Sequence, residues 1–365
     1  MKAFVTGGTG FIGQHVVRKL LERGYEVVAL ARSQSSATKL REMGATVARG
    51  DITEKESMRD GMSGAEVVFH VAGWYEVGTG DWMVGETINV GGTRNVLTLA
   101  DEMDIPRIIY VSTVAVFGDT GGELVDEHYR SDGPFISEYD RTKWLAHYKV
   151  AEPLIEQGAP IIIVMPGGVY GPGDPSLIGQ MMELFYSGIP ALPGPETTLT
   201  YAHVEDIAEG IILAAEKGEP GESYILAGPA VPLGEMFDFW SYLTGRRAPQ
   251  IRIPAGAVRP LAPVAGAAQT VLPLPQMTSE EVINTLGATY MARADKARTE
   301  LGWRPRPLQA GMLETFEWIA SKRSPSPLRE NERKVAGLAL LAAAVLFILW
   351  RLSRDSAENS QDPED

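Results

Sequence analysis

The chain has 365 residues, of which 44% are hydrophobic and 22% charged, as is typical of a globular protein with one large or two fused domains. Its formal net charge of −14 argues against a nucleic-acid partner, because such a partner requires a basic face. The absence of cysteine excludes disulfides, thiolate metal ligands and a cysteine nucleophile. The five histidines show no metal-ligand spacing, so we expect no metal site.

A glycine-rich turn, TGGTGFIG, occupies residues 6–13 directly after a short apolar run. The run predicts a buried strand, and residues 11–23 predict a helix because apolar side chains recur at helical spacing. Gly7, Gly10 and Gly13 therefore lie in a strand-to-helix turn, which directs backbone N–H groups and a helix dipole toward an anion such as a dinucleotide pyrophosphate. The alternative is an ordinary glycine-rich loop.

Strand-like and helix-like segments alternate through the first two-thirds of the chain. Continuous apolar strands separated by helices predict an α/β fold, a doubly wound Rossmann sheet of about seven parallel strands covered on both faces. The predicted strands lie at 2–6, 26–31, 46–50, 66–71, 107–113, 160–166 and 223–228. The predicted helices lie at 11–23, 35–43, 54–61, 87–103, 137–157 and 204–217.

From about residue 171 proline and glycine become dense, which predicts a smaller and more irregular substrate lobe. The dinucleotide-binding domain is expected at 1–170 and 201–228, the lobe at 171–200 and 229–321, and a linker at 322–334. The acidic tail at 351–365 is expected to be disordered.

The segment VAGLALLAAAVLFILW, residues 335–350, carries no charge and is apolar on every face. At 1.5 Å per residue it spans about 24 Å, which approaches the roughly 30 Å hydrocarbon core of a bilayer. It predicts a single-pass C-terminal transmembrane helix; the alternative is a buried core helix. Basic residues are more numerous before the span than after it, so we expect the catalytic part to stay in the cytoplasm. They are Lys322, Arg323, Arg329, Arg333 and Lys334 before it, and Arg351 and Arg354 after it.

The second predicted strand ends in ALARS, without the acidic residue that holds the ribose hydroxyls in many NAD sites. Arg32 offers a guanidinium to a ribose 2′-phosphate, which favours NADP(H) over NAD(H). The alternative is a solvated surface arginine. Asp51, in GDIT, follows the third strand, where its carboxylate can accept a hydrogen bond from an adenine amino group.

Tyr139 and Lys143 are four residues apart in YDRTK and lie on one face of a predicted helix. A tyrosine acts as a general acid or base near neutral pH only if its pKa falls from about 10, and a neighbouring cation favours the phenolate. Upstream, Ser112 and Thr113 end a strand with hydroxyls able to donate to a substrate oxygen. Many helices contain Y-x-x-x-K by chance, but its place after a dinucleotide turn indicates a catalytic set.

With these motifs the chain resembles the extended short-chain dehydrogenase/reductase family, of the NAD-dependent epimerase/dehydratase type. The matching stretches are TGGTGFIG, GDIT, HVAG, INVGGTRNVL, STVAVFG, YDRTK, PGGVYGPGD and HVEDIAEG, within roughly residues 1–320. The resemblance implies that Thr113 is the catalytic hydroxyl, Tyr139 the acid/base and Lys143 the ribose ligand, with Asn89 near a supporting water or the substrate. It also implies a homodimer through 87–103 and the helix around Tyr139. Further implied cofactor contacts are Phe11, Ile12, Ile52, Val71, Ala72, Pro166, Gly168 and Val169.

The sequence lacks the arginines with which sugar-nucleotide enzymes of this family hold a diphosphate. At the positions that correspond to the diphosphate-binding segments of those enzymes, this chain instead has the triplet Leu199-Thr200-Tyr201 and the residues Met165 and Gly168. The chain is more similar to dihydroflavonol reductases and 3β-hydroxysteroid dehydrogenases, which act on apolar ketones and alcohols. In the lobe, Met181 and Phe185 are candidate substrate contacts, with core packing as the alternative.

The leading hypothesis is a membrane-anchored, NADP-dependent oxidoreductase that interconverts a hydrophobic ketone and a secondary alcohol. Hydride would pass between nicotinamide and substrate carbon, while Tyr139 exchanges the proton on oxygen and Thr113 orients that oxygen. One alternative is a sugar-nucleotide epimerase or dehydratase, which an assay with UDP- or GDP-sugars distinguishes. The other is a non-catalytic dinucleotide sensor or scaffold, which the intact catalytic set disfavours.

Overall fold

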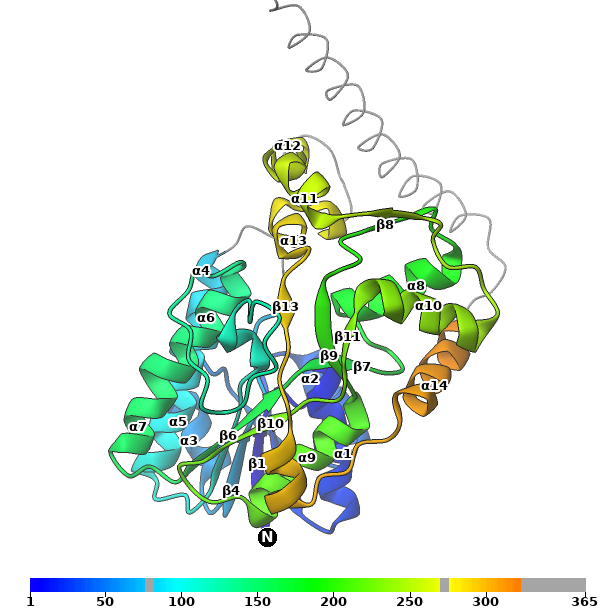
Figure 1. Ribbon diagram of the computed structural model, residues 1–365. Helices are drawn as coiled ribbons and strands as arrows, with labels where there is room; N and C mark the ends of the chain where they lie inside the picture. The colour runs from blue at the N-terminus through cyan, green and yellow to red at the C-terminus, as the bar shows by residue number, and fades with distance from the viewer. Residues whose placement is uncertain (76–81, 270–275, 323–365) are drawn as a thin grey trace, which may run out of the picture.

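The computed structural model describes residues 1–75, 82–269 and 276–322. Its larger part is a seven-stranded sheet with the order β10-β6-β5-β4-β1-β2-β3, in which every neighbouring pair is parallel (Figure 1). The strands are β1 (Lys2–Thr6), β2 (Glu26–Ala31), β3 (Thr46–Arg49), β4 (Val67–His70), β5 (Ile108–Val111), β6 (Ile161–Pro166) and β10 (Ser223–Leu226). These are the seven strands predicted from the sequence, and the doubly wound Rossmann sheet is confirmed.

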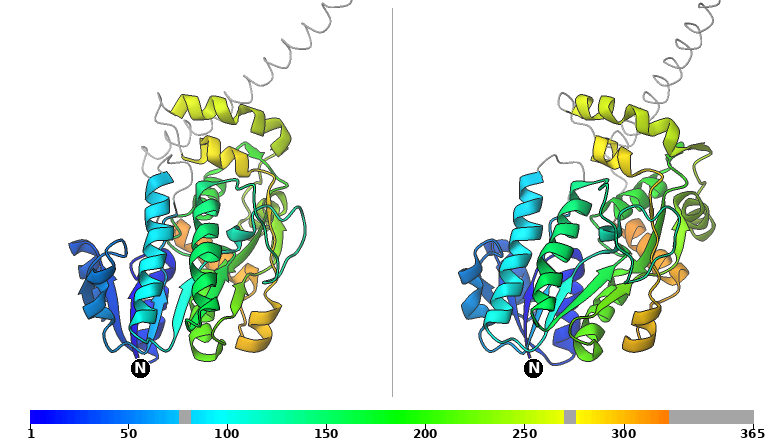
Figure 2. Two further views of the ribbon diagram at one scale, coloured as in Figure 1. Left: turned by 90° about the vertical axis from the view of Figure 1, so that its left-hand side faces the viewer. Right: turned by 60° about the vertical axis from the view of Figure 1, so that its left-hand side comes forward.

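Helices cover both faces of this sheet (Figures 1 and 2). On one face α1 (Phe11–Glu22) packs beside α9 (Val204–Lys217). On the other, the helical rod that ends in α5 (Thr93–Glu102) lies beside the rod that begins with α6 (Glu138–Ala146). The remaining helical segments of this domain are α2 (Gln34–Glu42), η1 (Lys55–Met58), α3 (Arg59–Met62), α4 (Trp82–Gly85), η2 (Glu86–Gly92), η3 (Val114–Phe117), η4 (His147–Ala151) and α7 (Glu152–Glu156).

Three predicted helices change their hydrogen-bond pattern along their length. The segment predicted at 54–61 is a short 3₁₀ turn, η1, followed by α3. The segment predicted at 87–103 opens as the π-helical η2 and continues as α5. The segment predicted at 137–157 passes through the π-helical η4 before α7, where Pro153 has no N–H to donate to the preceding turn. Apolar periodicity located these helices but did not reveal the change of pitch.

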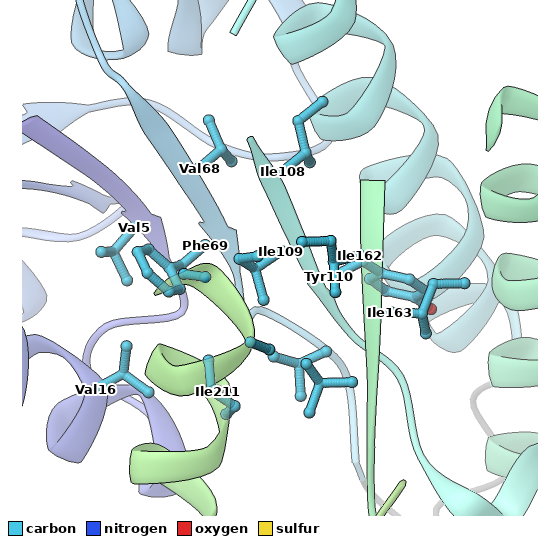
Figure 3. Packing of buried hydrophobic residues seen from close by; sticks show 14 of the residues in the cluster. Val5, Val16, Val68, Phe69, Ile108, Ile109, Tyr110, Ile162, Ile163 and Ile211 are labelled. Carbon is cyan, nitrogen blue, oxygen red and sulfur yellow. The ribbon is translucent and has the colours of Figure 1, made fainter. Parts of the chain in front are cut away.

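The main hydrophobic core lies between the sheet and its helices (Figure 3). Val5, Phe69 and Ile109 come from the adjacent strands β1, β4 and β5 and are fully buried. They face Val16 of α1 and Ile211 of α9, which are also fully buried. Each such side chain contributes roughly 1.5–3 kcal/mol on burial, so this packing fixes the strand ends from which the site is built.

The C-terminal lobe has a second core and is largely helical rather than irregular. Phe185 of α8 (Leu177–Ser187), Trp240 of α10 (Leu233–Thr244) and Phe316 of α14 (Leu308–Ser321) pack together in it. Strand β9 (Thr198–His203) pairs with β7 (Gly168–Tyr170), β11 (Ala230–Pro232) and β13 (Thr289–Tyr290), and β8 (Ala191–Pro193) pairs with β12 (Ile251–Ile253). The outer end of the lobe holds α11 (Ala255–Val258), η5 (Arg259–Leu261), α12 (Ala262–Gln269), η6 (Gln276–Thr278) and α13 (Glu280–Thr285) (Figure 1).

One stretch of the segment assigned to the lobe packs on the first domain instead. The helix η7 (Ala297–Leu301) and Trp303 belong to the main core, and the Trp303 indole N–H donates to the Asp206 carbonyl at 2.7 Å. The chain therefore returns to the Rossmann domain before α14, and this return attaches the lobe to α9.

The predicted linker beyond residue 322, the apolar span 335–350 and the tail 351–365 lie outside the described residues. Within the described ranges no helix is long and apolar enough to cross a membrane.

Candidate active site

The glycine turn joins β1 to α1 through a backbone conformation that side chains would obstruct. Gly7 has φ +73°, and a Cβ on it would lie 2.5 Å from the Ala72 nitrogen. A Cβ on Gly13 would lie 2.0 Å from the Gly7 carbonyl oxygen. Gly10 is the N-cap of α1 without a side-chain cap, and the first turn has no acidic residue. The N-terminus of α1 thus keeps N–H groups available to an anion.

A cavity of about 1830 Å³ runs from this turn to the outer end of the lobe. It lies at the carboxyl ends of the strands, beside β1 and β4, where the strand order of the sheet reverses. Every residue predicted to be catalytic or to bind cofactor lines it: Gly7, Gly10, Phe11, Ile12, Gly13, Arg32, Asp51, Ile52, Val71, Ala72, Thr113, Tyr139, Lys143, Pro166, Gly168 and Val169. The fold therefore brings these residues together, and their individual roles remain predictions.

One end of the cavity is polar and lies beyond the carboxyl ends of β2 and β3. Arg32 is exposed there, directly after β2, and Ser36 lines the cavity beside it. The Ser33 hydroxyl caps α2 by accepting the Ser36 N–H at 3.1 Å. One Asp51 carboxylate oxygen accepts both the N–H and the hydroxyl of Thr53 at 3.0 Å. The Asp51 carboxylate therefore stabilises its own loop through Thr53 and also lines the cavity.

Thr113, Tyr139 and Lys143 meet at the middle of the cavity. Thr113 follows β5 as the N-cap of η3, and its hydroxyl accepts the Ala115 N–H at 3.2 Å. Lys143 is only 5% exposed, and its ammonium donates to the Val111 carbonyl at 3.0 Å. Burial lowers the pKa of this lysine to about 7, because removal from water disfavours the charged form.

The expectation that Lys143 lowers the pKa of Tyr139 is wrong for this arrangement. Burial raises the pKa of the Tyr139 phenol above its ordinary value, and the neighbouring Asp140 carboxylate raises it further. Only the hydrogen bond with the Thr113 side chain acts in the other direction. Burial has the largest effect on the pKa of the phenol, and both Tyr139 and Lys143 are buried.

Two of the three candidate substrate residues lie away from the cavity. Asn89 is buried behind its wall, where its amide bonds the Trp74 main chain, at 2.7 Å and 3.1 Å, and the Thr142 hydroxyl at 2.9 Å. Phe185 packs in the lobe core, so core packing was the right alternative for it. Met181, four residues earlier on α8, lines the cavity. An amphipathic helix divides such residues between core and cavity, and composition alone does not say which face is which.

The lobe half of the cavity is lined almost entirely by apolar side chains. Among its described lining residues only Asp174 and Glu183 carry a charge, and both are acidic. Asp174 accepts the N–H and the hydroxyl of Ser176, so it holds the start of α8. The apolar wall comes from α8, β8, β12 and the outer helices, including Leu184, Leu192, Ile253, Leu261, Val282 and Ile283.

The family model for the NAD dependent epimerase/dehydratase family matches residues 3–227, which covers all of the seven-stranded sheet except Lys2. The chain belongs to this family. It is accordingly an enzyme of the extended short-chain dehydrogenase/reductase type, with a site for a nicotinamide dinucleotide.

Relatives of known name extend the similarity into the lobe. The chain is 32% identical over 317 residues to the 4-hydroxy-2-methyl-3-oxo-4-farnesyl-3,4-dihydroquinoline-1-oxide ketoreductase of Stigmatella aurantiaca, covering 84% of this chain and 92% of that one. It is 30% identical over 271 residues to a 3-beta-hydroxysteroid dehydrogenase of Mycolicibacterium neoaurum, covering 69% and 72%. Among solved structures, gox2253 has a TM-score of 0.76 and 32% identity, covering 87% of this chain and 98% of its own.

Three residues that line this cavity were not recognised in the sequence. The Tyr75 ring meets the Tyr139 ring edge-on, with 4.8 Å between centroids. Asp140 is 3% exposed and lines the cavity beside Tyr139. Tyr290, from β13, donates its hydroxyl to Asp140 at 2.9 Å. The helix-start pattern Ser-x-x-Asp at 137–140 was a readable signal for Asp140. No local pattern marks Tyr290, because its partner lies 150 residues away.

Proposed function

We propose that this protein is an NADP(H)-dependent oxidoreductase that interconverts a hydrophobic ketone and a secondary alcohol. The observation that carries the proposal is that Thr113, Tyr139 and Lys143 line the same cavity as the apolar wall of the lobe. The names of two relatives, a ketoreductase of a farnesylated quinoline and a 3-beta-hydroxysteroid dehydrogenase, agree with a bulky apolar substrate.

The residues present fit a dinucleotide. The glycine turn leaves a cradle that a Cβ on Gly7 or Gly13 would fill, and the uncapped N-terminus of α1 suits the pyrophosphate. When bound, the nicotinamide supplies or accepts the hydride. Tyr139 would exchange the proton on the substrate oxygen, Thr113 would hold that oxygen by a hydrogen bond, and Lys143 would donate to the ribose.

The lining of the lobe half favours an apolar substrate over a nucleotide sugar. A diphosphate carries negative charge that must be paired when it is buried. The described lobe lining contains no lysine or arginine, and its two charges, Asp174 and Glu183, would repel a diphosphate. A polycyclic or prenylated ketone requires no such partner and gains roughly 25 cal/mol per Å² of apolar surface buried.

The test of this function compares two substrates. The full chain in detergent should oxidise NADPH when given a saturated steroid 3-ketone, a bulky apolar probe, and should leave UDP-glucose unchanged in the presence of NAD. Product formation is followed by mass spectrometry, with each substrate omitted in turn as the control. Epimerisation of UDP-glucose without reduction of the ketone would instead support the sugar-nucleotide alternative.

Cofactor preference rests on Arg32, which is exposed at the cavity end where an adenosine ribose would lie. Arg32→Asp should weaken NADPH binding by at least about tenfold and NADH binding far less, because it replaces a phosphate ligand with a repelling charge. Titration calorimetry with both cofactors measures the difference. Arg41→Asp is the matched control, since Arg41 is exposed on α2 and does not line the cavity. Equal weakening of both cofactors by Arg32→Asp would identify Arg32 as a surface residue.

The apolar segment 335–350 supports a further part of the proposal, a C-terminal membrane anchor with the catalytic domain in the cytoplasm. The full chain should then sediment with membranes, and protease added to cytoplasm-exposed membranes should digest the catalytic domain. Recovery of the full chain wholly in the high-speed supernatant would contradict the anchor, and protection of the domain would reverse its orientation.

We also propose a homodimer through the helix at 87–103, formed by η2 and α5, and through α6, which packs against η2 on the same face of the sheet (Figure 2). Light scattering in detergent should then give twice the mass of one chain. A single-chain mass over a wide range of concentration would exclude it.

A further inference from the structure

The two-residue strand β13 binds the segment that carries Thr113. The Thr289 N–H and hydroxyl both donate to one Asp119 oxygen at 2.9 Å, and the Thr120 N–H donates to the Thr289 carbonyl at 2.8 Å. Asp119 and Thr120 follow η3, the short helix that Thr113 caps, after the single residue Gly118. This side of β13 therefore fixes the position of the loop that leaves the catalytic hydroxyl.

The other side of β13 binds the turn that carries Tyr139. Tyr290 donates its hydroxyl to Asp140 at 2.9 Å, and Asp140 is the next residue after Tyr139 in the first turn of α6. The Asp140 N–H in turn donates to the Ser137 hydroxyl at 3.1 Å, which caps the helix. The first turn of a helix lacks intrahelical partners for its N–H groups, so such side-chain bonds determine how firmly it is held.

We propose that Tyr290, acting through Asp140, is a positioning residue for Tyr139, and that β13 sets the spacing between the Tyr139 phenol and the Thr113 hydroxyl. This inference rests on the proposed catalytic roles of those two groups. β13 belongs to the lobe and pairs with β9, so the spacing is set by a strand of the substrate lobe rather than by the Rossmann sheet. Thr285 and Leu286, just before β13, line the cavity, which places bound substrate against the same segment.

The charge on Asp140 affects how strongly this link holds. Burial raises the pKa of the Asp140 carboxyl to about 7, the nearby Glu281 raises it further, and the bonds from Tyr290 and Ser137 lower it. The other titratable groups beside it are Tyr139, Tyr290 and Tyr75, and the Asp140 charge raises the pKa of each. An ionised carboxylate accepts a hydrogen bond more strongly than a neutral acid, so the link weakens as pH falls below about 7.

The test is Tyr290→Phe in the full chain, with NADPH and the saturated steroid 3-ketone. We expect kcat to fall about tenfold while the KM for NADPH changes less than about twofold, because only the placement of Tyr139 is disturbed. The acid limb of the pH–rate profile that comes from weakening of the Tyr290–Asp140 bond should disappear, since Phe leaves no such bond for protonation of Asp140 to weaken. Tyr201→Phe is the matched control. Tyr201 lies on β9, and its buried hydroxyl has no hydrogen-bond partner in the described part of the chain.

A second variant and a substrate-free measurement complete the test. Asp140→Asn keeps an oxygen that can accept a hydrogen bond from Tyr290. The double variant D140N/Y290F should be no slower than the slower of the two single variants, because the two substitutions act on the same bond. Without substrate, Tyr290→Phe should speed amide hydrogen exchange in residues 138–142, whereas Tyr201→Phe should not. This readout stands even if the steroid ketone is not reduced. Unchanged exchange, additive losses in the double variant, or a kcat within about twofold of the unmodified protein would overturn the inference.

Discussion

Replacing Tyr139 with Phe is expected to lower kcat by about a hundredfold or more, because the change removes the hydroxyl that would exchange the proton and little else. The ring keeps its edge-on contact with Tyr75, at 4.8 Å between centroids, so the local packing persists. NADPH affinity should change little, since Phe still fills the same wall of the cavity. Steady-state kinetics with the steroid ketone, together with calorimetry for NADPH, separate the two effects.

Tyr75→Phe is the matched control for this experiment. Tyr75 is 45% exposed, lines the same cavity and contacts the Tyr139 ring, so the substitution removes a hydroxyl from the same cavity. Loss of the Tyr75 hydroxyl should reduce kcat far less than loss of the Tyr139 hydroxyl. A Tyr139→Phe enzyme that keeps more than about a tenth of the original kcat would remove Tyr139 from the proton-transfer step.

Gly13→Ala should abolish measurable NADPH binding, and activity with it. The added Cβ would lie 2.0 Å from the Gly7 carbonyl oxygen and 3.1 Å from the Gly8 Cα. Neither is the end of a flexible side chain, so the turn between β1 and α1 must move as a whole. Such a movement shifts the helix N-terminus and the N–H groups that would hold the pyrophosphate. Fluorescence titration with NADPH measures the loss.

Gly91→Ala provides the control for this substitution. Gly91 lies in the helical segment η2, and a Cβ there meets nothing within 4 Å. Alanine is favoured over glycine in a helix by roughly 0.8–1 kcal/mol, so the variant should bind NADPH normally and melt no earlier than the unmodified protein. If Gly13→Ala bound NADPH as Gly91→Ala does, the cofactor would not depend on the glycine turn.

The sequence by itself determined the Rossmann sheet and the cofactor half of the cavity. All seven strands were located, because parallel strands buried on both faces appear as continuous apolar runs. Tyr139 was found from its helical spacing to Lys143, and Gly13, Arg32 and Thr113 were found from their places after strands. In a doubly wound sheet the residues that follow each strand meet at one edge, so the order of the strands is enough to bring them together.

Only the tertiary structure decided the rest. It showed that α8 turns Met181 to the cavity and Phe185 to a core, which depends on where α10 and α14 pack. It also showed that burial, rather than the nearby Lys143, governs the pKa of Tyr139, because desolvation depends on the atoms that surround a group and not on its neighbours in sequence. The bond between Tyr290 and Asp140 joins residues 150 positions apart, and no local pattern records a contact that exists only after the lobe has folded onto the sheet.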